Sequence, residues 1–251
     1  MQMSTLPQWM AALPQLLIVA GLTVIFAAWA WGARAITSAA AITGTILTLV
    51  LCTAAGPGAL AAIAVVFLLT HFSTRTGRSK KERLGSMEKR EGRGPVQLLA
   101  NLGAGTLCAV PLLFTPHARW LLLAATSAAL AEAAGDTVSS ELGQVFGRHP
   151  RLITTLRPVP PGKDGGITAA GSLLSVAAIL ITCWACEWAN LLAPDYYWTA
   201  AAAAFAGTLL DSLLGATLER PGRLGNNSVN FTSSAFAAAV ALLALVARRW
   251  M

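Results

Sequence analysis

The chain alternates between long apolar stretches and shorter polar connections. Apolar stretches close to the length of a membrane span occupy residues 13–32, 36–55, 57–73, 96–115, 119–139, 167–190, 197–217 and 229–247. An α-helix needs about 20 predominantly apolar residues to cross the hydrocarbon core of a bilayer. The pattern therefore predicts an all-α, polytopic transmembrane helical bundle with about eight spanning helices. The range is about six to nine, because residues 36–73 are also compatible with one element broken around Gly56-Pro57-Gly58.

The composition supports a membrane protein. Of the 251 residues, 55% are hydrophobic and 12% are charged, whereas a soluble domain carries about 25% charged residues. Cys52, Cys108, Cys183 and Cys186 all lie inside apolar stretches, without His or Cys partners at zinc spacing. The last two have the spacing of a redox pair, but a thiolate in the middle of a span is poorly solvated. We expect all four to be small apolar packing residues.

The basic residues indicate an orientation. Much of the net charge of +7 is concentrated in residues 74–95, TRTGRSKKERLGSMEKREGRGP. Such a run can bind nucleic acid, but between two spans it is more typical of a cytoplasmic loop facing anionic lipid, so we expect a lipid bilayer and no nucleic acid as partner. Lys and Arg also collect in loops 143–166 and 218–228 on the same side. We predict a multi-pass protein of the cell (inner) membrane, with these loops in the cytoplasm and both termini outside.

Acidic residues occur inside two spans, where they are costly and usually functional. Glu132, Asp136 and Ser140 are spaced to share one helix face, and Glu141 follows where the chain reaches the cytoplasmic interface. In a later span Asp211 shares a face with two glycines, which predicts a carboxylate in a groove open to a neighbouring helix.

The last span begins with a polar face. Asn227 and Asn230 belong to it, within the segment NNSVNFTSS at residues 226–234. Oxygen ligands that converge from separate helices suit Mg²⁺, so we predict a Mg²⁺ site with Asp136 and Asp211, and Glu141 as a further candidate ligand. The alternative is that the two aspartates only form hydrogen bonds between helices.

A glycine-rich turn lies between the two acidic spans. Gly162-Lys163-Asp164-Gly165-Gly166 directly precedes a helix expected to begin near Ile167. Backbone N–H groups of such a turn, the positive end of the helix and the Lys163 charge together favour a bound anion. The spacing is not that of a Walker A motif, and a Pro/Gly-rich stretch by itself is usually only a turn.

Several segments resemble one membrane family. GDTVSSELG (135–143), PRLITTLRPVPPGKDGGIT (150–168), DSLLGATLE (211–219) and NNSVNF (226–231) are similar to the family that includes plant phytyl-phosphate kinase and animal transmembrane protein 19. KKERLGSMEKREGRGPVQLLANLG (80–103) resembles it too. The resemblance implies phosphoryl transfer from a nucleoside triphosphate, typically CTP, to an isoprenoid monophosphate, which becomes the diphosphate.

The candidate site residues combine this resemblance with the reasoning above. Asp136, Glu141, Lys163 and Asp211 are the expected catalytic residues. The expected substrate- and nucleotide-binding residues are Lys80, Lys89, Asn101, Thr137, Ser140, Arg151, Thr154, Thr155, Arg157, Gly165, Gly166, Asn226, Asn227 and Asn230. Gln97 also matches the family, Asp164 stands where relatives often have Asn, and Glu132 lies outside the family pattern.

The leading hypothesis is a Mg²⁺-dependent isoprenoid monophosphate kinase, in which no nucleophilic side chain is needed because the acceptor's phosphate oxygen attacks. One rival is a CTP-dependent lipid cytidylyltransferase, and another is an ion-coupled transporter or lipid flippase. Residues 1–251 are expected to form a single integral membrane domain, with N-terminal helices at 13–73, the basic loop at 74–95 and catalytic helices and loops at 96–247. Homodimer formation is left open.

Overall fold

The computed structural model describes residues 8–84, 92–115, 117–248 and 250, with side chains from residue 14 onward. The helices are α1 Gln8–Gly32, α2 Ser38–Ala55, α3 Gly58–Arg75, α4 Arg78–Leu84, α5 Pro95–Ala109, α6 Arg119–Phe146, α7 Ala169–Trp188, α8 Tyr197–Leu214 and α9 Asn226–Ala247. Short 3₁₀ turns cover Val110–Leu113 and Pro194–Tyr196, and a π-helical turn covers Gly215–Glu219. Within the described ranges, eight helices are long and apolar enough to cross a membrane. The predicted all-α membrane bundle is confirmed.

The helix boundaries differ from the sequence prediction in a few places. Residues 36–73 do form two helices, as predicted for eight spans, because Gly56, with φ of 114°, reverses the chain between α2 and α3. Helix α6 continues past residue 139 to Phe146, and α9 begins at Asn226 rather than at residue 229. The expected basic loop contains the short helix α4. The loop after α6 carries a two-stranded antiparallel pair, β1 Arg151–Leu152 with β2 Gly166–Ile167.

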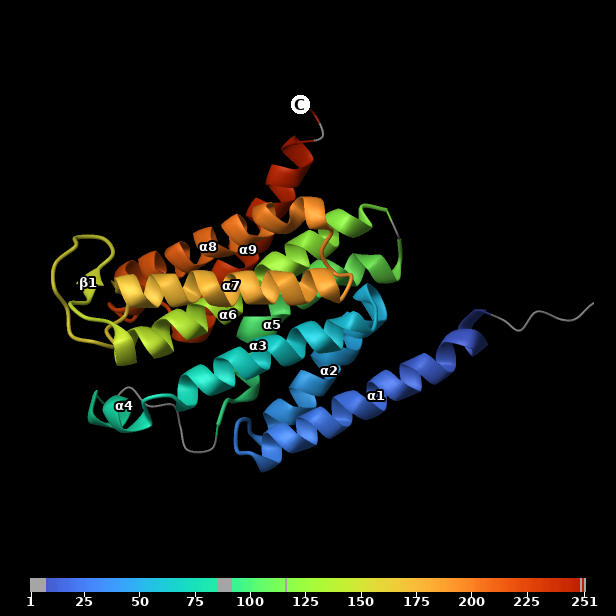
Figure 1. The fold of residues 1–251 in the computed structure, drawn as a ribbon, viewed down its shortest axis with the longest axis horizontal. Helices are drawn as coiled ribbons and strands as arrows, with labels where there is room; N and C mark the ends of the chain where they lie inside the picture. Colours follow the sequence, from blue (N-terminus) through green and yellow to red (C-terminus); the bar gives the residue numbers. More distant parts are fainter. Residues whose placement is uncertain (1–7, 85–91, 116, 249, 251) are drawn as a thin grey trace, which may run out of the picture.

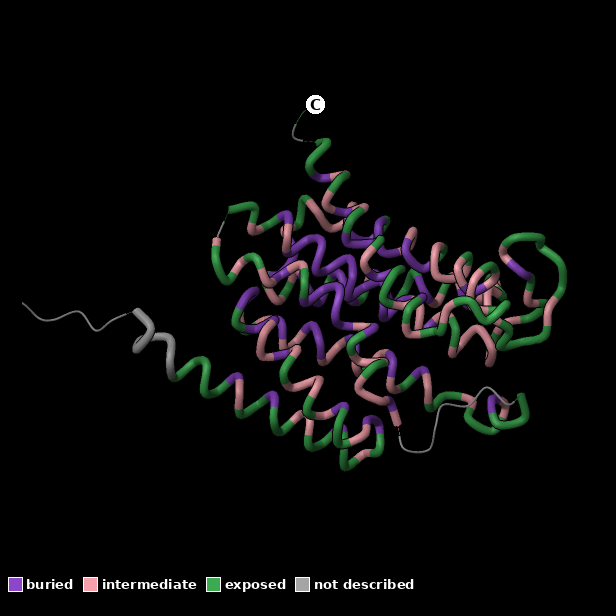
Figure 2. Tube along the Cα trace, turned by 180° about the vertical axis from the view of Figure 1, so that it is seen from behind, coloured by how far each residue is buried: buried purple, intermediate pink, exposed green. Residues whose placement is uncertain are grey.

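Helix α6 is the centre of the bundle. It packs against α3, α5, α7, α8 and α9, whereas α1 lies at the edge against α2 (Figure 1). Buried positions concentrate along these central helices and exposed ones on the outer surfaces (Figure 2). Many buried residues of α6 are alanine, which suits lipid, where small residues let helices approach closely. At Gly135 an added Cβ would lie 2.7 Å from Ile179 of α7, so this contact requires glycine.

The polar connections gather at one end of the bundle. Helix α4 and the β1–β2 hairpin both lie there, at the left of Figure 1. The C-terminal end of α6, the π turn after α8 and the first turn of α9 line a common pocket at this same end. The helices thus bring together segments that are widely separated in the sequence.

Candidate functional site

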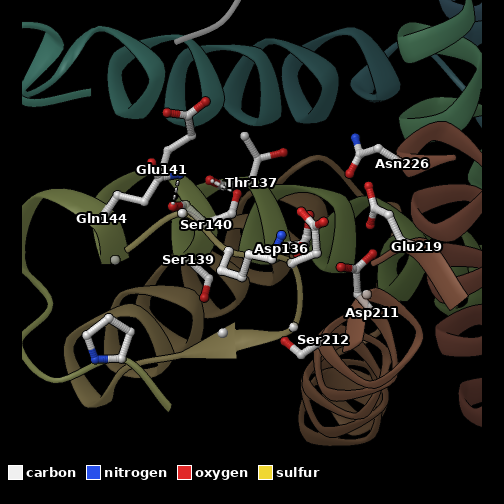
Figure 3. Close-up of a pocket in the computed structure, with 18 of the residues that line it drawn as sticks. Asp136, Thr137, Ser139, Ser140, Glu141, Gln144, Asp211, Ser212, Glu219 and Asn226 are labelled. Atoms are coloured by element: carbon white, nitrogen blue, oxygen red, sulfur yellow. Dashed lines mark hydrogen bonds between the residues drawn. The ribbon is translucent and has the colours of Figure 1, made fainter. Parts of the chain in front are cut away.

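A polar pocket of about 250 Å³ opens at this end of the bundle. Its walls come from the start of α5, the last turns of α6, the glycine turn, the α8 π turn and the start of α9 (Figure 3). Of the predicted site residues, ten line this pocket: Asp136, Thr137, Ser140, Glu141, Lys163, Gly165, Gly166, Asp211, Asn226 and Asn230.

The two intramembrane aspartates meet in this pocket. The carboxyl groups of Asp136 on α6 and Asp211 on α8 are in hydrogen-bonding contact. Ser233 of α9 donates a hydrogen bond to Asp211 Oδ2 at 3.1 Å. Two carboxylates this close repel each other when both are ionised. Either one of them carries a proton, or a bound cation offsets the repulsion. The prediction that these groups converge from separate helices therefore agrees with the geometry.

A third carboxylate joins the pair. Figure 3 shows Glu219 directed toward Asp211 and Asp136. The π-helical turn over Gly215–Glu219, with a hydrogen bond from the Arg220 N–H to the Gly215 carbonyl at 3.0 Å, widens the end of α8. Such widened turns rotate the following side chains relative to an α-helix and occur often at functional sites. No role for Glu219 was predicted from the sequence, because its direction depends on this π turn.

Glu132 extends the acidic face toward the centre of the bundle. Its side chain is buried, and Ser234 donates a hydrogen bond to Glu132 Oε2 at 2.5 Å. Glu132 Oε1 has no hydrogen-bond partner within the described part of the chain. Gly207 of α8 makes room for it, since a Cβ there would lie 2.6 Å from Glu132 Cγ. The helix-face argument that grouped Glu132 with Asp136 thus finds the right side of α6.

The carboxylate oxygens of the pocket suit Mg²⁺ if substrate phosphates and water supply the remaining ligands. Among the described residues, no three His, Cys, Asp or Glu side chains are placed to hold a metal ion by themselves. Mg²⁺ is usually held by one or two carboxylates together with water and substrate phosphates, and Asp136 and Asp211 provide such a pair. The described pocket lining carries five acidic side chains and two basic ones. A polyphosphate could enter only with additional positive charge.

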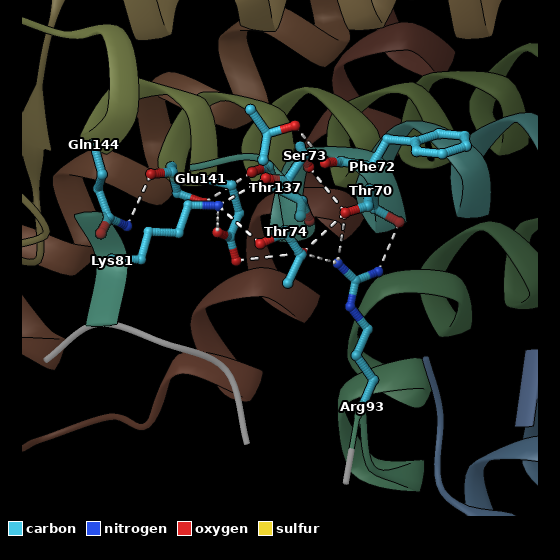
Figure 4. Close-up of polar contacts among 11 residues, drawn as sticks. Thr70, Phe72, Ser73, Thr74, Lys81, Arg93, Thr137, Glu141 and Gln144 are labelled. Atoms are coloured by element: carbon cyan, nitrogen blue, oxygen red, sulfur yellow. Dashed lines mark hydrogen bonds and ion pairs between the residues drawn. The ribbon is translucent and has the colours of Figure 1, made fainter. Parts of the chain in front are cut away.

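Glu141 makes a different contact from the one expected. Its carboxylate forms an ion pair with Lys81 of α4 at 2.5 Å, and Thr74 donates a hydrogen bond to it at 3.3 Å (Figure 4). The Lys81 ammonium group also donates hydrogen bonds to the carbonyls of Ser73 and Thr74 at the end of α3. This contact gives Glu141 a structural role, and we leave it out of the metal site.

Arg93 lies beside this ion pair. Its guanidinium group donates hydrogen bonds to the Thr70 hydroxyl at 2.6 Å and to the Thr74 hydroxyl at 3.0 Å (Figure 4). Its backbone forms a bridge with Ile36, and Gly92 fits against Ala35 so closely that a Cβ would lie 2.5 Å from the Ala35 carbonyl carbon. Arg93 and Lys81 were not singled out from the sequence, where they are two cations among many.

The glycine turn lines the same pocket beside the acidic cluster. The Gly166 N–H donates to the Lys163 carbonyl at 2.9 Å. Gly165 has φ of 72°, and a Cβ there would lie 2.5 Å from the Ala216 backbone nitrogen, so the turn packs directly on the π turn of α8. Helix α7 begins at Ala169 rather than near residue 167, and Thr168 accepts a hydrogen bond from the Gly171 N–H as its cap.

The asparagines separate into two groups. Asn226 and Asn230 line the polar pocket, and Asn230 donates a hydrogen bond to the Asn101 side chain at 3.2 Å. Asn227 instead lines a lateral groove between α5 and α9.

Besides Asn101 and Asn227, five predicted binding residues lie outside the lining of the pocket. Lys80 donates to the Val145 carbonyl at 2.7 Å, which fastens α4 to α6, and Arg151 donates to the Leu156 carbonyl at 2.8 Å. Thr154, Thr155 and Arg157 are exposed in the loop between β1 and β2. These residues match the family in sequence, but they do not line the pocket in this structure. Lys89 falls outside the described residues.

Comparison with known proteins identifies the family. A family model described as "Integral membrane protein DUF92" matches residues 21–238. An uncharacterized membrane protein of Synechocystis sp. is 35% identical over 67% of this chain and 67% of its own length. Arabidopsis thaliana has two relatives: Protein PGR, 31% identical over 68% of this chain and 76% of its own length, and Protein VTE6, chloroplastic, 28% identical over 72% of this chain and 56% of its own length. No solved structure matches. The family expected from the sequence is confirmed: the chain belongs to the DUF92 family of integral membrane proteins.

Proposed function

We propose that this protein is a membrane lipid-phosphate kinase. It transfers a phosphoryl group from a nucleoside triphosphate, with CTP favoured, to an isoprenoid monophosphate such as phytyl, geranylgeranyl or polyprenyl phosphate. The observation that carries the proposal is the meeting of Asp136 and Asp211, from two helices, in a polar pocket that the Lys163 turn also lines. Acidic groups for a divalent cation and a cationic glycine turn for phosphate are the parts that phosphoryl transfer requires.

Asp136 and Asp211 would hold Mg²⁺, with Glu219 beside them. When bound, the ion would neutralise charge on the nucleotide phosphates. Lys163, which lines the pocket, would hold the terminal phosphates. Asn226 and Asn230 offer amide donors on the α9 side of the same pocket.

The chemistry needs no covalent intermediate. An oxygen of the acceptor's phosphate attacks the γ-phosphorus, the bond from that phosphorus to the β–γ bridging oxygen breaks, and the nucleoside diphosphate leaves. A phosphate monoester has a second pKa near about 6, so it is mostly dianionic at neutral pH and no base must remove a proton. The side chains therefore act by positioning the two phosphates and by offsetting their charge.

The geometry and the resemblance support different parts of the proposal. The pocket favours a polyphosphate with a divalent cation, whereas the isoprenoid acceptor and CTP come from the resemblance to the phytyl-phosphate kinase family. The Lys and Arg distribution supports a pocket facing the cytoplasm at the inner membrane.

The decisive experiment is product analysis. Purified protein in detergent is incubated with Mg²⁺, one of CTP, ATP, GTP or UTP, and phytyl, geranylgeranyl or polyprenyl monophosphate, and the products are identified by mass spectrometry. A kinase gives the lipid diphosphate and a nucleoside diphosphate. A nucleotide–lipid adduct with pyrophosphate would instead establish a cytidylyltransferase, and no turnover with any pair would refute the proposal.

Variants then test the site. Asp136→Asn and Asp211→Asn should each lower kcat by about 100-fold or more while the protein stays folded, because each removes a charged ligand at constant volume. Glu187→Gln is the matched control, since Glu187 lies near the far end of α7 and should change kcat by less than about 2-fold. Near-normal activity of both Asp variants at saturating Mg²⁺ would exclude this pair as the metal site.

A further inference from the structure

A second cavity lies between helices α1, α2, α3 and α5. Its volume is about 70 Å³ and its lining is mostly apolar, with Phe26, Ala27, Ala30, Ala41, Gly44 and Phe67 among the residues that form it. Along α1 it extends from Thr23 to Ala30, which is about 10 Å at 1.5 Å per residue. On α1 it occupies the half that leads toward the polar end of the bundle, and on α3 it extends from Ile63 to Thr70, toward the same end. The cavity therefore runs from the polar end into the depth of the bilayer.

The apolar cavity and the polar pocket share a boundary. Arg93 lines both of them. Asn101 lines the apolar cavity and accepts the hydrogen bond of Asn230, which lines the polar pocket. Arg93, which is only 7% exposed, and the hydrogen-bonded pair Asn101–Asn230 thus lie at the boundary between the two cavities.

We infer that the apolar cavity binds the first part of the acceptor's hydrocarbon chain, with the acceptor's phosphate next to Arg93 and its reacting oxygen in the polar pocket. This inference rests on the proposed lipid-phosphate kinase function. A lipid phosphate needs an apolar cavity for its chain and a cationic side chain next to that cavity for its phosphate. A buried guanidinium group is well suited to bind phosphate. Small side chains such as Ala27, Ala41 and Gly44 leave room for the methyl branches of an isoprenoid.

The lateral groove between α5 and α9 is the competing place for the chain. It is apolar, with a volume of about 480 Å³, and it is lined by residues that include Val96, Leu99 and Phe231. However, it shares no lining residue with the polar pocket. A chain in that groove would be separated from Asp136 and Asp211, whereas a chain in the inner cavity continues past Arg93 to the site.

The test compares a variant that fills each space. Ala41→Phe narrows the inner cavity, and Val96→Phe narrows the lateral groove. KM is measured with phytyl monophosphate and with dimethylallyl monophosphate, whose five-carbon chain is too short to depend on the cavity. Ala41→Phe should raise KM for the phytyl acceptor by about 10-fold or more, because the displaced chain loses apolar burial, and change KM for the short acceptor by less than about 2-fold. Val96→Phe should leave both values within about 2-fold.

Photocrosslinking of the unaltered protein gives an independent measurement that does not depend on variant folding. Phytyl monophosphate with a diazirine in its chain should label peptides of α2 and α3 that include residues 41–48 and 63–70. Labelling confined to residues 96–107 and 227–232, or an equal loss with both acceptors in Ala41→Phe, would overturn the inference. Failure of the kinase proposal is seen separately, as absence of nucleotide-dependent turnover of every acceptor by the unaltered protein.

Discussion

Replacement of Lys81 by methionine should destabilise the protein far more than replacement of any exposed cation in the same basic segment. The Lys81 side chain is 1% exposed and that of Glu141 is 17% exposed. Lys81→Met keeps most of the apolar stem but leaves Glu141 without its cation and two α3 carbonyls without their donor. Helix α4 should then detach from α3 and α6.

The magnitude follows from the burial. Removing one partner of a buried ion pair costs about 3–5 kcal/mol, because the other charge remains buried and unpaired. Water can still reach part of Glu141, so we expect a loss near the lower limit, about 3 kcal/mol. For a chain of this size that corresponds to a fall in melting temperature of about 6–12 °C.

Arg78 provides the control on the same short helix. It forms an ion pair with Glu82, but the side chains are 57% and 51% exposed. Exposed pairs contribute about 0–1 kcal/mol, so Arg78→Met should lower the melting temperature by no more than about 4 °C. The double variant Lys81→Met with Glu141→Gln should recover about 1–2 kcal/mol, because it removes the unpaired charge.

The assay is thermal unfolding of the purified protein and its three variants in one detergent, followed by intrinsic tryptophan fluorescence. Equal melting temperatures for Lys81→Met and Arg78→Met would refute the buried ion pair. A double variant no more stable than Lys81→Met would show that the unpaired Glu141 charge is not the cause of the loss.

Three further predictions concern the glycine turn and the orientation. Lys163→Ala should lower kcat/KM for the nucleotide by about 10- to 1,000-fold, or about 1.4–4 kcal/mol. Arg157→Ala, in the exposed hairpin loop, is the control and should leave kcat/KM unchanged. Equal effects of the two variants in steady-state kinetics would exclude Lys163 from phosphate binding. Gly165→Ala should lower both activity and melting temperature, because its positive φ and its contact with the α8 π turn leave no space for a Cβ; a variant with unchanged kinetics would show that the turn is only a connector. Thiol labelling of intact cells from outside should modify Asp195→Cys and not Thr155→Cys, and the reverse would place the polar pocket on the outer side.

The membrane fold could be predicted closely because lipid restricts the choices. A backbone in the hydrocarbon core must satisfy its own hydrogen bonds, so each long apolar stretch becomes a helix. The break at Gly56 was visible as a Gly-Pro-Gly sequence. Helix α4 and the extension of α6 to Phe146 were not visible, because these segments are polar and their helical structure depends on contacts with other elements, such as the Lys81–Glu141 pair.

The candidate site could be predicted in part for a related reason. A carboxylate in an apolar span is conspicuous, and this signal was enough to find Asp136 and Asp211. It failed for Glu219, whose direction depends on a π turn, and for Arg93, whose burial depends on Thr70 and Ala35. The sequence shows how many Lys and Arg residues a loop carries, but it does not show which of them becomes buried.

The position of the acidic face also bears on transport as an alternative. The acidic residues extend from the polar end of the bundle inward to Glu132. Ser234 and Gly207 pack against the Glu132 side chain. Beyond it, residues 119–131 of α6, 197–206 of α8 and 235–247 of α9 contain no acidic residue. An ion-coupled transporter exposes its central site to each side of the membrane in turn, and these outer segments offer no carboxylate to an ion that leaves on the far side. A site with one entrance is what an enzyme requires when its nucleotide comes from the water on that side and its acceptor from the bilayer.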